Sequence, residues 1–146
     1  MDFLLKNLIE VRDIDCLPVN SIMAPVAFVT GLTDAPMIRK KLLSTFNSWT
    51  LEDKLLWNDL AKCLSGDVDG PGGKSFLDWV KIISEMSIAG LKARKKGEEK
   101  YFSNFSENIF LHGPLSFQKQ NNFKKSGKPL KKYIFLHCYF LLLFYF

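Results

Sequence analysis

The last third of this sequence has almost no acidic side chains. Residues 101–146 contain one acid, Glu107, and six lysines, whereas residues 1–100 contain 14 acidic and 14 basic side chains. The net charge of +5 therefore comes from the last third, and the rest of the chain has no charge excess that would attract nucleic acid. We expect no nucleic-acid partner.

The chain also lacks a cysteine framework and a histidine cluster. Its three cysteines, Cys16, Cys63 and Cys138, are odd in number and widely spaced, which argues against a disulfide scaffold and fits a reducing compartment. His112 and His137 have no ligand partners at metal-binding spacing. The opening "MDFLLKNLIEV" has too short an apolar run for a secretory signal. We expect a cytoplasmic protein, or a plastid one in a plant-like source.

The sequence does contain enough apolar material for one domain, since 47% of its 146 residues are hydrophobic. Helix signals follow one another along it. Capping boxes are formed by Thr50 with Asp53 and by Ser75 with Asp78. Asn20 or Ser21 is a plausible cap for an apolar helix that Gly31 would end. These signals predict helices at about 21–31, 34–49, 50–64 and 75–96.

Two of these helices carry apolar stripes. The third carries a leucine stripe at helical spacing, and the fourth a stripe of aromatic and aliphatic residues that we interpret as core. Arg94, Lys95 and Lys96 close the fourth helix as a solvated cap. The stripes comprise Leu51, Leu55, Leu56, Leu60 and Leu64, and Phe76, Trp79, Val80, Ile83, Met86 and Leu91.

The glycine-rich segment 65–75, "SGDVDGPGGKS", predicts a loop. It ends in Gly-Lys-Ser, but Val68 stands where a phosphate-binding loop needs glycine, and a helix instead of a strand precedes it. Asp67 and Asp69 lack the further ligands of a calcium loop. Neither binding motif is therefore predicted.

Residues 109–146 form a basic and aromatic tail with no capping signal. The last 14 residues are apolar except for His137, and as a helix they would span about 21 Å of the roughly 30 Å hydrocarbon layer. Three interpretations stay open: a marginal membrane anchor, a buried terminal segment, or translated sequence beyond the original gene end. The bias toward residues with A/T-rich codons favours the third, and membrane contact of the tail is the less favoured alternative.

The stretch "NLIEVRDID", Asn7–Asp15, has the apolar alternation of a strand. If it is extended, Leu8, Glu10, Arg12 and Ile14 share one side. Glu10 and Arg12 are then neighbours, either as an ordinary ion pair on a wet sheet face or as part of a working site.

Three segments resemble glutamate-cysteine ligases of the plant-type branch. The string "LIEVRDID" followed by "IMAPVAFVTGL" resembles a strand and an apolar helix in the C-terminal part of that family. "FNSWTLED" and "ISEMSIAGLKARKKGEEKYFSNF" resemble later segments, the second through its A-G-L-x-x-R pattern. The resemblance covers roughly Phe3–Phe105 and does not extend into the tail.

The resemblance implies an ATP-dependent ligase related to glutamine synthetases. Such enzymes convert the γ-carboxylate of glutamate into an acyl phosphate that the amine of cysteine attacks, in glutathione biosynthesis. By this resemblance Glu10 binds Mg²⁺, and Arg12 binds the transferring phosphoryl group of ATP as a catalytic residue. The amine acceptor stays open, because related carboxylate-amine ligases share the E-x-R segment.

The implied fold is an α+β fragment: one or two strands of an antiparallel glutamine synthetase-like sheet, followed by a mainly helical C-terminal part. Residues 1–108 would be the C-terminal part of the catalytic domain, and residues 109–146 the unmatched tail. Because most of the sheet and the other metal ligands of the family are missing, we expect the fragment to be inactive by itself. The alternative is a small helical interaction protein held to a membrane by its basic, aromatic tail.

Overall fold

The computed structural model describes residues 17–61 and 68–129. This part of the chain is 78% helical and contains six α-helices and no strand, so the predicted α+β fold is wrong. Its one extended pairing is an isolated bridge between Asp69 and Ser75. The α+β prediction depended on Asn7–Asp15 and the resemblance, and that stretch lies outside the described residues. In segments 51–64 and 76–91 the apolar residues recur at helical spacing, which favours helix formation.

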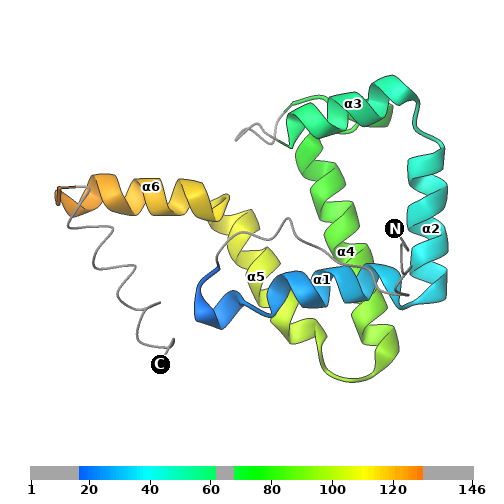
Figure 1. Cartoon of the computed structure of the whole chain (residues 1–146), viewed down its shortest axis with the longest axis horizontal. Helices are drawn as coiled ribbons and strands as arrows, with labels where there is room; N and C mark the ends of the chain where they lie inside the picture. The colour runs from blue at the N-terminus through cyan, green and yellow to red at the C-terminus, as the bar shows by residue number, and fades with distance from the viewer. Residues whose placement is uncertain (1–16, 62–67, 130–146) are drawn as a thin grey trace, which may run out of the picture.

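Figure 1 shows the helices arranged around α4, the longest of them. α1 crosses α4, α3 lies at the N-terminal end of α4, and α5 packs against α1 and α4. α6 continues from α5 and extends away from the other helices. In chain order the elements are the 3-10 turn η1 (Val19–Ser21), α1 (Ala24–Thr33), α2 (Pro36–Asn47), α3 (Leu51–Leu60), the 3-10 turn η2 (Pro71–Gly73), α4 (Phe76–Arg94), α5 (Glu99–His112) and α6 (Leu115–Ser126).

Both predicted capping boxes are confirmed. At the start of α3 the Asp53 backbone N–H donates to Thr50 Oγ1 at 3.1 Å, and the Thr50 N–H donates to the Asp53 carboxylate at 3.0 Å. Ser75 and Asp78 make the same exchange at the start of α4. The side-chain hydrogen bond from Ser75 lowers the pKa of Asp78 from its usual value of 3.8. The stabilisation that ionised Asp78 gives the folded chain is therefore fully present above pH 3.8. It is lost as the pH falls through the lowered pKa of Asp78.

The start and end of α1 differ from the prediction. Neither Asn20 nor Ser21 caps it, because both lie in η1, and α1 begins at Ala24 with Pro25 in its first turn. Gly31 does not end the helix but lies inside it and is buried. The glycine is needed for close packing and not for a change of backbone direction.

Gly31 and Gly90 form the crossing point of α1 and α4. A Cβ atom on Gly90 would lie 1.9 Å from the Gly31 carbonyl oxygen, and one on Gly31 would lie 2.2 Å from the Ser87 carbonyl oxygen. The Ser87 hydroxyl donates to the Phe28 carbonyl oxygen at 2.9 Å, which gives this buried polar group a partner. The backbones of the two helices are therefore close enough to exclude any side chain between them.

The main core surrounds this crossing. Ala24, Ala27, Leu91 and Phe102 are buried there, and the rings of Phe28 and Phe102 lie 4.9 Å apart. Small residues on α1 let α4 and α5 approach it from two sides. The core thus brings together Ala24 and Phe102, which come from the early and late segments of the resemblance.

A second cluster consists of aromatic rings at the junction of α2, α3 and α4. Trp49 packs edge-on against Trp79 at 4.9 Å and against Phe46 at 4.8 Å. Trp57 lies between Trp49 and Phe76. The indole N–H of Trp79 donates to the Pro71 carbonyl oxygen at 2.7 Å, which fixes η2 against α4.

The leucine stripe predicted on α3 is largely exposed. Leu60 is buried, but Leu51 and Leu55 are 72% and 57% exposed, and Leu64 lies outside the described residues. α3 packs through Trp57 and Leu60 instead. An apolar stripe at helical spacing shows that a helix forms but does not show which side finds a partner.

Candidate functional site

Glu10 and Arg12, the predicted metal ligand and phosphoryl-binding residue, lie outside the described residues. The described chain begins at Leu17, five residues after Arg12, and enters η1 and then α1. Eleven residues of sequence separate Arg12 from Ala24, the first residue of α1.

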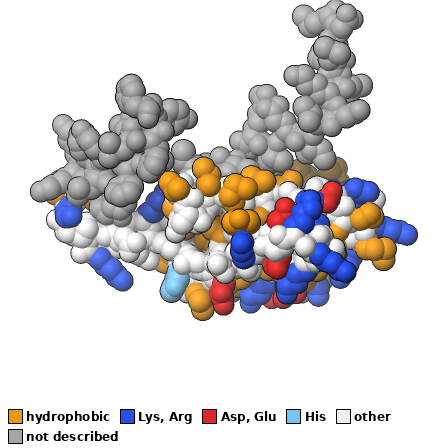
Figure 2. All heavy atoms as spheres, turned by 90° about the horizontal axis from the view of Figure 1, so that it is seen from below, with side chains coloured by type: hydrophobic (Ala, Val, Ile, Leu, Met, Phe, Trp, Pro, Cys, Tyr) orange, Lys and Arg blue, Asp and Glu red, His pale blue; other side chains and the backbone are white. Residues whose placement is uncertain are grey.

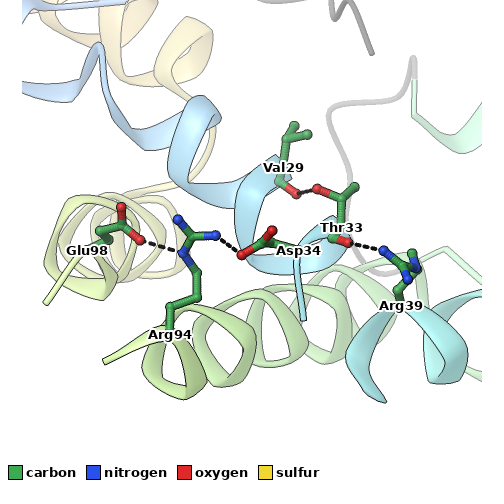
Figure 3. Close-up of polar contacts among 6 residues, drawn as sticks. All are labelled: Val29, Thr33, Asp34, Arg39, Arg94 and Glu98. Carbon is green, nitrogen blue, oxygen red and sulfur yellow. Dashed lines mark hydrogen bonds and ion pairs between the residues drawn. The ribbon is translucent and has the colours of Figure 1, made fainter. Parts of the chain in front are cut away.

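A partly buried cation lies at the far end of α1. Figure 3 shows the Arg94 guanidinium between two carboxylates, Asp34 after α1 and Glu98 before α5. Its Nε donates to Glu98 at 2.7 Å, its Nη1 donates to Asp34, and the arginine side chain is only 17% exposed. The sequence predicted that Arg94 is part of a solvated cap, and for this residue the prediction is wrong. Arg94 joins the ends of three helices, and its charge is already balanced.

Replacing Arg94 with methionine should destabilise the chain by about 1–2 kcal/mol, because two carboxylates lose their cation while the apolar stem is kept. The loss is moderate because Asp34 is 58% exposed and is partly solvated. Urea unfolding followed by circular dichroism measures it. Lys92→Met, an exposed position on the same helix, is the control and should change the midpoint little. Equal effects of the two substitutions would contradict a bridging role for Arg94.

An apolar groove of about 260 Å³ lies between α1, α4 and α5. Its polar groups include the hydroxyls of Ser84 and Ser106, and Ser106 donates to the Ser103 carbonyl oxygen at 2.9 Å. A groove of this composition suits an apolar group and no charged one. Its apolar lining includes Pro25, Phe28, Val80, Phe105, Ile109 and Phe110.

A more polar cavity of about 570 Å³ lies where η1, α5 and α6 meet. Lys100, Asn104 and Asn108 line it from one side of α5, and Asn20 and Ser21 line it from η1. A lysine with amide and hydroxyl groups can bind an anionic or hydrogen-bonding group. Lys100 and Tyr101 are the titratable side chains among the described residues that line it.

Metal-ligand clusters and membrane spans were two further kinds of candidate. Among residues 17–61 and 68–129, no group of three or more histidine, cysteine, aspartate or glutamate side chains is placed to hold a metal ion. In the same residues no single helix is both long and apolar enough to cross a membrane. Val19–Thr33 and Pro36–Asn47 meet both criteria together, with an 85° bend between them.

Comparison with protein-family models, curated proteins and solved structures finds no match for this chain.

Proposed function

We propose that the chain is the C-terminal part of an ATP-dependent glutamate-cysteine ligase. In that enzyme Glu10 binds Mg²⁺, and Arg12 binds the phosphoryl group that passes from ATP to the γ-carboxylate of glutamate. A hard cation takes oxygen ligands, and a fixed guanidinium stabilises the charge that develops on phosphoryl oxygens. The amine of cysteine then attacks the acyl carbon of this acyl phosphate, which forms the amide bond and releases inorganic phosphate.

One observation supports this proposal from the helical part of the chain. Two segments that resemble the ligases, Ile22–Leu32 and Ile83–Phe105, are 50 residues apart in the chain and pack against each other through Gly31 and Gly90. Arg94, the arginine of the A-G-L-x-x-R pattern, joins the same helices by its two ion pairs. These two segments therefore form one packed unit.

The described residues also indicate what this unit does. Arg94 is neutralised by Asp34 and Glu98, so it does not offer its charge to a phosphate. The unit instead packs α1 against α4 and α5. A single carboxylate, Glu10, is too few ligands for Mg²⁺, so the proposal requires the other metal ligands to come from additional ligase sequence.

The test begins with the DNA upstream of the Met1 codon, where an in-frame extension with further acidic motifs is expected. The extended polypeptide should release phosphate from ATP only when glutamate and cysteine are both present. Arg12→Lys and Glu10→Gln should each lower kcat by about a hundredfold or more, because each removes a contact to the transferring group or its metal. Lys40→Gln, at an exposed position on α2, should leave kcat unchanged.

The 146-residue chain by itself should release no phosphate above the blank under the same conditions. A stop codon upstream without acidic motifs, or an extended polypeptide whose ATP hydrolysis is indifferent to glutamate, would overturn the proposal.

A further inference from the structure

α6 differs from the other helices in how little of it is covered. It extends away from α4 (Figure 1), and none of its residues is buried. It is fixed at its beginning, where the Gln118 amide donates to the Gly113 carbonyl oxygen at 2.7 Å and to Asn108 Oδ1 at 3.0 Å. The rest of the helix projects from this attachment.

The charge on this part of the molecule is of one sign. Lys124 and Lys125 lie in the exposed last turn of α6, Lys128 follows it, and no acidic residue occurs after Glu107. In the view of Figure 2, the described residues near the α6 end of the molecule show basic side chains and no acidic ones. Lysines that lack acidic neighbours in the sequence add up to a positive potential, which attracts a negatively charged surface.

Large apolar side chains are exposed at the end of α5 and the start of α6, before these lysines in the chain. Leu111 is 72% exposed, Phe117 45% and Phe110 37%. We call residues 110–128, which contain these side chains and the three lysines, the basic arm. In the sequence the arm is followed, after two more lysines, by the uncharged segment 133–146.

We propose that the basic arm binds the surface of an anionic lipid bilayer. This inference goes beyond the ligase proposal and does not depend on it. The lysines attract the arm within the range of the surface potential, and each contributes roughly fivefold to binding. Phe110, Leu111 and Phe117 then insert at the boundary between headgroups and acyl chains.

Two observations favour a bilayer over a nucleic acid. The arm holds no arginine, the side chain that binds phosphate with two parallel hydrogen bonds, since the last arginine in the chain is Arg94. Its exposed phenylalanine and leucine side chains would gain little from a sugar-phosphate backbone, whereas a bilayer buries them.

The test is sedimentation of the full chain with vesicles. Vesicles of phosphatidylcholine with about one third phosphatidylserine should carry the protein down at about 0.1 M salt, and much less at about 0.5 M salt. The triple variant K124Q/K125Q/K128Q should bind these vesicles about a hundredfold more weakly. The matched control K40Q/K41Q/K54Q removes the same charge from exposed positions on α2 and α3 and should bind like the original chain.

Three results would overturn the inference. Equal loss in both triple variants would show that net charge matters and the arm does not. Equal binding to pure phosphatidylcholine would assign the binding to segment 133–146 alone. Tighter binding to a duplex oligonucleotide than to the anionic vesicles, lost in the arm variant, would assign the arm to nucleic acid.

Discussion

Gly90→Ala should destabilise the chain by about 3 kcal/mol or more, because the new methyl group would lie 1.9 Å from the Gly31 carbonyl oxygen. The obstacle is backbone in another helix, which cannot move aside as a flexible side chain can. At an ordinary helix-interior position the same substitution would stabilise by roughly 1 kcal/mol through helix propensity. The sign of the effect therefore reports directly on the α1–α4 crossing, and urea unfolding measures it.

Ala93→Leu is the matched control for this substitution. Ala93 lies on the same helix but is exposed, so a larger side chain there meets solvent. Leucine and alanine have similar helix propensities, and we expect the midpoint to change little. A Gly90→Ala variant as stable as the original chain would show that α1 and α4 do not cross at these glycines.

The sequence predicted the helix starts that depend on local chemistry. Thr50 with Asp53 and Ser75 with Asp78 satisfy backbone N–H groups within four residues, so the pattern contains the whole interaction. The end of α1 was mispredicted at Gly31 for the opposite reason. That glycine is placed for contact with a helix some 60 residues later, and no local signal distinguishes a packing glycine from a terminating one.

The candidate sites were less predictable than the helices. The ion pair of Arg94 with Asp34 joins residues 60 positions apart, and the charge pattern around Arg94 resembled a solvated helix end. The polar cavity combines Asn20 with Lys100 and Asn104, which only the packing of η1 against α5 brings together. One signal was present for Arg94: it is the arginine of the A-G-L-x-x-R pattern. The pattern gave no indication of the partners.

Trp79→Ala should cost about 3–5 kcal/mol of unfolding free energy. Trp79 is 8% exposed, packs edge-on against Trp49, and lies at the start of the longest helix. Its removal leaves a cavity at the junction of α2, α3 and α4, where the exposed leucines of α3 provide no substitute core. The near-ultraviolet circular dichroism of the packed tryptophans should weaken at the same time.

Trp79→Phe separates packing from hydrogen bonding at this position. Phenylalanine keeps most of the ring contact with Trp49 but leaves the buried Pro71 without its donor, at a cost of about 1–2 kcal/mol. We therefore expect the phenylalanine variant to lie between the original chain and Trp79→Ala. Leu55→Ala, at an exposed position on α3, should change stability by less than either. If Leu55→Ala were as damaging as Trp79→Ala, the stabilising face of α3 would be its leucine stripe, and the aromatic cluster would not be the second core.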